Sequence, residues 1–182
     1  INDDSIDPLA EFRAVNVEGT MTLARQALGA GVSRFIFISS IGVNGNLNRT
    51  SFLETDAHNP VENYAVSKSE AEYGLRGLLR GSKVELVIIR QPLVYGPQAP
   101  GNFRTLMDWA SKPLLISLPL GLIQNKRSFV ALDNLISFIT LCIDHPKAAN
   151  ETFLISDGED VSTTELLQKV AKAFGKKALL LP

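Results

Sequence analysis

Two serines at the end of an apolar run, with a tyrosine and a lysine further along the chain, are the residues whose types and spacing suit proton transfer. Ser39 and Ser40 close the run, and Tyr64 and Lys68 stand four apart, so on a helix their side chains share one face. A free phenol has a pKa of about 10, and a nearby cation lowers it. We expect Lys68 to lower the pKa of Tyr64, Tyr64 to carry the proton, and Ser40 to hydrogen-bond the reacting oxygen.

A Tyr-x-x-x-Lys pair taken alone is most simply a chance pair on a helix surface. The apolar segment 34–39 upstream of it changes this interpretation, because such a run is typical of a strand buried on both faces of a parallel sheet. In open α/β sheets ligands bind at the carboxyl ends of the strands, which is where the two serines lie. The serines at a strand end together with the Tyr64–Lys68 pair therefore favour a functional site over a chance pair.

The elements that would hold this site alternate between apolar strands and amphipathic helices. Segments 34–39 and 84–89 are expected to be parallel strands of adjacent layers, and segments 8–28 and 64–79 helices packed on the sheet. The sequence therefore predicts an α/β fold, with residues 1–96 forming a sheet domain and residues 97–182 a substrate-side part whose strands and helices partly return to that sheet. In that second part we expect helices at 102–111, 133–144 and 162–174 and a strand at 153–155.

Composition excludes several classes of partner. Lys and Arg number 18 against 19 Asp and Glu, so there is no basic field for nucleic acid or an anionic membrane. The apolar stretches are interrupted before the roughly 20 residues of a membrane helix. Cys142, the one cysteine, is expected to be a buried, inert thiol, which suits a reducing cytoplasm. His58 has no metal-ligand spacing around it; we treat it as solvated and expect no metal site.

Five stretches match the motifs of a known family. They read NVEGT at 16–20, FIFISSIGVNG at 35–45, YAVSK at 64–68, IRQPLVYGP at 89–97 and RSFVALDNL at 127–135. With them the chain resembles the extended short-chain dehydrogenases/reductases, and within these the nucleotide-sugar 4-epimerases and 4-keto-sugar reductases of bacterial polysaccharide synthesis. The resemblance implies a Rossmann-like doubly wound parallel sheet, present in part, with a smaller substrate-binding α/β part.

The resemblance also implies roles for individual residues. Tyr64, Lys68 and Ser40 would be catalytic, with Lys68 also bonding the nicotinamide ribose. Arg127 would bind the nucleotide diphosphate, although an exposed, solvated arginine is the alternative, and Asn102 matches a less specific diphosphate position. NAD is the implied cofactor, with NADP left open, and its contacts would be Asn16, Ser39, Ser40, Tyr64, Lys68 and Pro92.

Two departures from the family pattern narrow the function. Leu93 stands where many epimerases have a substrate-binding asparagine. Ile41 and Gly42 stand where 4,6-dehydratases carry an Asp-Glu pair, and without that acid and base a dehydratase could not eliminate water. Three functions remain: an NAD-dependent 4-epimerase of a UDP-sugar, a 4-keto-sugar reductase using NAD(P)H, and a catalytically silent truncated domain with a binding role.

Three expected features of a dinucleotide-binding fold are not found in the sequence. Such a fold opens with a strand, a glycine-rich turn at a helix N-terminus and, about twenty residues later, an acid for the ribose. We therefore expect the chain to be a fragment, or the ordered part, of a protein roughly twice this size. For that protein we expect a nucleotide-sugar substrate, a homodimer and a cytoplasmic location.

Overall fold

The chain forms two compact units, each built from two separate segments. The structure is a computed structural model that describes residues 5–97 and 123–176. Residues 1–92 and 136–155 make the first unit, and residues 93–135 and 156–182 make the second. All but two of the residues proposed for the site, Asn102 and Arg127, belong to the first unit.

A three-stranded parallel sheet forms the centre of the first unit. Strand β1 (Arg34–Ser40) pairs along its whole length with β2 (Glu85–Gln91), and β5 (Thr152–Leu154) pairs with the other edge of β2. The three expected strands are confirmed, but β1 and β2 are neighbours within one sheet and not members of adjacent layers. Burial on both faces holds for β2, which is central, whereas β1 is half-buried over much of its length.

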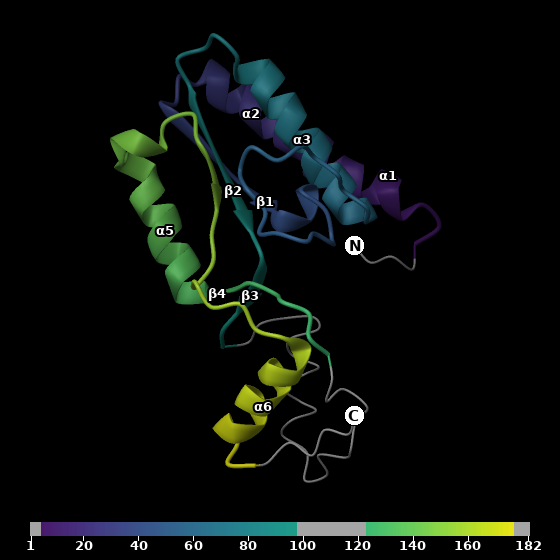
Figure 1. Cartoon of the computed structure of the whole chain (residues 1–182). Coiled ribbons are helices and arrows are strands. Elements are labelled where there is room, and N and C mark those ends of the chain that lie inside the picture. Colours follow the sequence, from purple (N-terminus) through teal and green to yellow (C-terminus); the bar gives the residue numbers. More distant parts are fainter. Residues whose placement is uncertain (1–4, 98–122, 177–182) are drawn as a thin grey trace. The chain divides into compact units, whose positions relative to one another are not determined.

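Helices cover both faces of this sheet (Figure 1). One face carries α1 (Pro8–Arg13), a π-helical turn η1 (Ala14–Gly19), α2 (Thr20–Gly29) and α3 (Asn63–Leu79); the other carries α5 (Leu132–Asp144). The helices expected at 8–28 and 64–79 are confirmed, although the first is interrupted by the π-helical turn. The parallel sheet with helices on each face confirms the Rossmann-like α/β class.

The close approach of α2 and α3 depends on a glycine. A Cβ atom at Gly74 would lie only 2.8 Å from the sulfur of Met21. Around this contact Ala24, Ala71 and Leu75 are completely buried. Small residues on both helices therefore allow α3 to lie against α2 while its other side faces the sheet.

The second unit contains a separate two-stranded sheet. Strand β3 (Leu93–Tyr95) pairs in parallel with β4 (Phe129–Ala131), and α6 (Thr163–Ala173) begins at the expected capping box of Ser162 and Glu165. Neither strand of this small sheet was expected. The helix expected at 102–111 lies outside the described residues.

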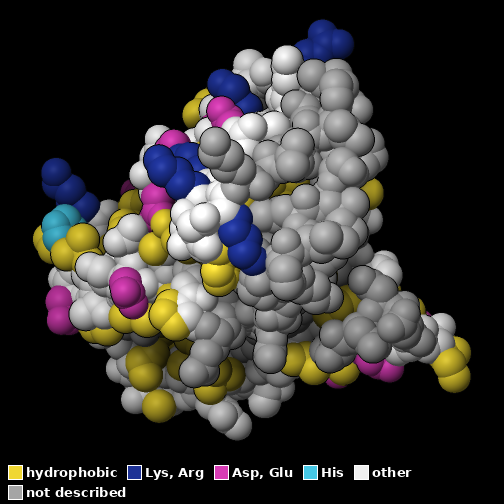
Figure 2. All heavy atoms as spheres, turned by 90° about the horizontal axis from the view of Figure 1, so that it is seen from below, with side chains coloured by type: hydrophobic (Ala, Val, Ile, Leu, Met, Phe, Trp, Pro, Cys, Tyr) yellow, Lys and Arg dark blue, Asp and Glu magenta, His cyan; other side chains and the backbone are white. Residues whose placement is uncertain are grey.

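Figure 2 shows blue and magenta side chains interspersed on the described part of one face. Within the described ranges, no helix has the length and apolarity that crossing a membrane requires.

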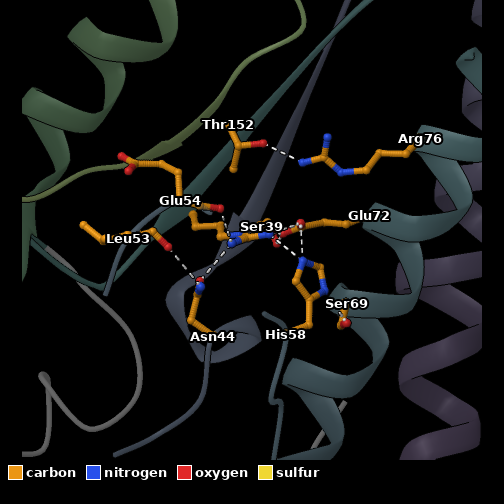
Figure 3. Close-up of polar contacts among 10 residues, drawn as sticks. Ser39, Asn44, Leu53, Glu54, His58, Ser69, Glu72, Arg76 and Thr152 are labelled. Atoms are coloured by element: carbon orange, nitrogen blue, oxygen red, sulfur yellow. Dashed lines mark hydrogen bonds and ion pairs between the residues drawn. The ribbon is translucent and has the colours of Figure 1, made fainter. Parts of the chain in front are cut away.

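A buried ion pair joins α3 to the sheet. Glu72 is 0% and Arg90 2% exposed. Arg90 Nε and Nη2 donate to the two carboxylate oxygens of Glu72 at 3.0 and 2.7 Å, and Ser39 Oγ donates to the same carboxylate at 2.5 Å (Figure 3). The pair therefore ties α3 to β2 and β1 at the end of the sheet where the serines lie.

We predict that Glu72→Gln lowers the free energy of unfolding by about 3–5 kcal/mol, because it leaves the buried guanidinium of Arg90 without a counter-charge. Urea unfolding followed by circular dichroism measures the change. Glu70→Gln is the matched control two residues away on α3, since Glu70 pairs with Arg13 at the surface. Its effect should be much smaller. Equal stability of Glu72→Gln and the unchanged chain would contradict the prediction.

Candidate active site

The two serines at the end of β1 have different partners. Ser39 is completely buried and its hydroxyl donates to Glu72. Ser40 is half-buried, and it caps the short 3-10 helix η2 (Ile41–Val43), because its Oγ accepts a hydrogen bond of 3.2 Å from the Gly42 amide. The Ser39 hydroxyl, which was predicted from the sequence to contact the cofactor, is thus buried and hydrogen-bonded to Glu72. Ser40 provides the hydroxyl at the strand end.

Gly42 brings this strand end against the first turn of α3. A Cβ atom at this position would lie 3.1 Å from the Cβ of Ala65 and 3.4 Å from Ser40 Oγ. Because glycine leaves this space open, the backbone after Ser40 passes directly beside the residue that follows Tyr64. The structure therefore brings Ser40 and the start of α3 together, as the sequence predicted.

Tyr64 and Lys68 lie on successive turns of α3. The ring of Tyr64 makes an edge-to-face contact with Phe12 at 5.7 Å, and 37% of Tyr64 remains exposed. Lys68 Nζ donates to the Ile38 carbonyl at 3.0 Å and lies 4.7 and 5.8 Å from the ring centres of Phe37 and Tyr64. The ammonium thus sits between the strand and the tyrosine, which keeps a solvent-accessible side.

Burial dominates the protonation of both groups. It raises the pKa of Tyr64 and lowers the pKa of Lys68, against an opposing effect of the Glu72 carboxylate on Lys68. The pKa of Tyr64 is raised, whereas the sequence led us to expect that Lys68 would lower it. The reason is geometric, since the ammonium bonds the Ile38 carbonyl and the phenol is partly removed from water.

Asn16 lies in the π-helical turn and reaches toward α3. Its Nδ2 donates to Ser67 Oγ at 3.0 Å, and Ser67 Oγ donates to the Tyr64 carbonyl at 2.7 Å. Single π-helical turns inside α-helices often occur at functional sites. The turn therefore connects Asn16 to the backbone of Tyr64, a link that helical periodicity does not reveal.

Pro92 follows directly on β2, whose last residue, Gln91, pairs with Ser40. The side-chain oxygen of Gln91 is buried and has no hydrogen-bond partner. This strand end thus holds an unused acceptor beside the Ser40 position, which suits a ligand with an N–H or O–H group.

Arg127, one of the proposed substrate residues, belongs to the second unit. Arg127 is exposed, and its backbone exchanges two hydrogen bonds of 3.0 Å with Val161. Asn102 lies outside the described residues. Their roles in substrate binding stay predictions.

Sequence reasoning missed the polar network behind the site. His58 was expected to be solvated, which is wrong: its side chain is 11% exposed and contacts Arg90 and Ser69. A signal existed in Glu72, one turn after Lys68, and in Arg90, at the end of an apolar strand, because two opposite charges on buried segments favour a pair. Within the described ranges no group of His, Cys, Asp or Glu side chains could hold a metal ion.

Comparisons with known proteins agree with this geometry. The profile of the NAD dependent epimerase/dehydratase family matches residues 2–156. A UDP-glucose 4-epimerase of Vibrio cholerae is 50% identical over the whole chain, which covers 56% of that protein. The chain thus spans about half the length of the curated relatives it matches.

Solved structures show the same fold. The dTDP-glucose 4,6-dehydratase DesIV from Streptomyces venezuelae, with NAD and TYD bound, superposes with a TM-score of 0.77 at 28% identity, over 95% of this chain and 54% of that one. The UDP-glucose 4-epimerase of Thermotoga maritima with UDP-glucose has a TM-score of 0.80 at 22% identity, over 96% of this chain and 58% of that one. Fold, motif placement and similarity converge, and the chain belongs to the NAD-dependent epimerase/dehydratase family of enzymes.

Proposed function

We propose that this chain provides the catalytic residues of an NAD-dependent nucleotide-sugar 4-epimerase. The observation that carries the proposal is the assembly of Tyr64, Lys68 and Ser40 at the carboxyl end of a parallel strand, with Tyr64 open on one side. The similarity to the Vibrio cholerae UDP-glucose 4-epimerase favours a UDP-sugar as substrate.

The residues at the strand ends fit a nicotinamide cofactor. Gln91 offers a buried acceptor without a hydrogen-bond partner, and Lys68 offers an ammonium with three N–H donors, one of which bonds the Ile38 carbonyl. Both suit a ligand carrying a carboxamide and ribose hydroxyls. When bound, NAD would take up a hydride from the sugar C4 and return it. The NAD-bound dehydratase DesIV supports this assignment.

In this mechanism the chain's own residues hold and move a proton. Tyr64 takes the proton of the sugar 4-hydroxyl and later gives it back, while Ser40 hydrogen-bonds that oxygen. Because burial raises the pKa of Tyr64, its ionised form depends on a neighbouring positive charge, and Lys68 lies next to its ring. Glu72, one turn further on, favours the charged state of that lysine.

Two alternatives to the epimerase remain. A 4-keto-sugar reductase would use Tyr64, Lys68 and Ser40 once and consume NAD(P)H. A domain with only a binding role would need none of the three. Nucleotide-sugar binding, a homodimer and a cytoplasmic location also stay predictions.

We predict that Tyr64→Phe lowers sugar turnover by about 10²–10⁴-fold and leaves cofactor binding nearly unchanged, because it removes the proton carrier and little volume. Turnover and NAD binding are measured in the protein encoded by the complete gene. Tyr73→Phe on the same helix is the control. Turnover of Tyr64→Phe within a few-fold of the unchanged protein would refute the catalytic role and favour the binding role. Conversion of a 4-keto sugar without epimerisation would favour the reductase.

Lys68→Met should impair both NAD binding and turnover, because it removes the ammonium that would meet the ribose and that lies beside the tyrosine. Calorimetric titration with NAD and a turnover assay separate the two effects. Lys83→Met, an exposed lysine of the same unit, serves as the control. Unchanged NAD affinity in Lys68→Met would exclude the contact with the cofactor.

A further inference from the structure

The loop of residues 41–62, which follows Ser40, is fastened to the buried ion pair at several points. Arg90 Nη1 donates to Asn44 Oδ1 at 3.0 Å and to the Glu54 carbonyl at 3.4 Å, and Asn44 Nδ2 donates to the Leu53 carbonyl at 3.3 Å. The Asn59 amide donates back to the Val43 carbonyl at 2.9 Å. Figure 3 shows the Asn44 side chain directed toward Ser39 and Glu72, with a dashed line to the Leu53 carbonyl. The position of the loop therefore depends on Arg90.

His58 is the titratable member of these contacts. Its Nε2 lies 2.5 Å from Arg90 Nη2, and its Nδ1 lies 2.8 Å from Ser69 Oγ. A guanidinium only donates hydrogen bonds, so Nε2 has to accept with its lone pair. The imidazole is therefore neutral, with its proton on Nδ1, where it is directed at the Ser69 oxygen.

The charges around the His58 ring come from two elements, α3 and β2. Glu72 on α3 has Oε2 at 3.4 Å from Nε2, but this oxygen already accepts from Arg90. Arg90 on β2 and Arg76 on α3 repel a positive imidazole, while Glu72 attracts it. The Tyr73 ring covers the imidazole at 4.6 Å between centres. Burial outweighs the attraction and lowers the pKa of His58.

We propose that neutral His58 is a positioning residue that fastens the loop 41–62 to Arg90, and that protonation of its Nε2 releases this loop. A proton on Nε2 would place a donor against the Arg90 guanidinium and remove the acceptor that the contact requires. Release of the loop would also free the backbone next to Ser40, and only the importance of this for catalysis rests on the proposed function. The contact itself does not depend on it.

The direction of the pH dependence follows from linkage. In the released loop His58 has an ordinary pKa of about 6.5, and in the folded loop a lower one. The fastened loop is therefore fully stable above pH of about 6.5 and loses stability as the pH falls from there toward the lowered pKa. Within that window its opening equilibrium grows at most roughly tenfold per pH unit.

The tautomer gives a first test in the 182-residue chain, with an internal control. The chain has two histidines, and His145 Nδ1 accepts a hydrogen bond of 3.2 Å from the Lys147 amide, which places the His145 proton on Nε2. Nitrogen-15 NMR of the imidazoles above pH 7 should therefore find opposite tautomers in His58 and His145. A proton on Nε2 of His58 would overturn the proposal.

Hydrogen exchange gives the second test, without NAD or sugar, so its result is separate from that of the turnover assays. After correction for intrinsic rates, protection of the Asn59 amide should be constant above pH of about 6.5 and fall up to roughly tenfold per unit below it. His58→Gln, which keeps an acceptor and does not titrate, should remove this slope, and His145→Gln should keep it. A flat profile in the unchanged chain, or a slope that persists in His58→Gln, would refute the release.

Discussion

A carboxylate and a guanidinium placed out of contact with water impose the strictest demand on this structure. Removing two charges from water costs several kcal/mol per ion, and their attraction offsets this only where their remaining hydrogen-bonding groups are also satisfied. Glu72 receives two bonds from Arg90 and one from Ser39, and Arg90 also donates to Asn44 and contacts His58. These hydrogen bonds form only when the strands, α3 and the loop 41–62 are all in place.

The same pair sets the register of α3 against the sheet. Tyr64, Lys68 and Glu72 are spaced by four residues and lie along one stripe of the helix. With Glu72 held against β2, the stripe places Lys68 at the Ile38 carbonyl and Tyr64 one turn beyond it, at the end of β1. A structural interaction in the core therefore determines where the proposed proton carrier stands, although it does not touch the reacting atoms.

The opposite side of α3 is held by packing and by neutral hydrogen bonds. Gly74 gives room to Met21, and the π-helical turn brings Asn16 to Ser67, which in turn bonds the Tyr64 carbonyl. An ion pair on one side and small, neutral contacts on the other leave α3 little freedom to rotate. Such preorganisation suits a site in which a phenol and an ammonium have to keep a fixed relation.

The elements of the fold were readable from local patterns. Apolar runs gave β1 and β2, helical periodicity gave α3, and the Ser162–Glu165 spacing gave the start of α6, because each depends on neighbours within a few residues. The shared face of Tyr64 and Lys68 follows from the same periodicity. The fold class and the family motifs were therefore predictable.

The burial, hydrogen-bond partners and pKa shifts of the side chains were decided only by the tertiary structure. His58 meets Ser69 and Arg90, which are 11 and 32 residues away, and Ser39 meets Glu72 33 residues away. No local pattern reports such partners, so His58 was taken as solvated and the burial of the Ser39 hydroxyl was not foreseen. The pKa of Tyr64 moves opposite to expectation for the same reason: desolvation depends on which distant segments cover a group, and spacing along the chain carries no information about that.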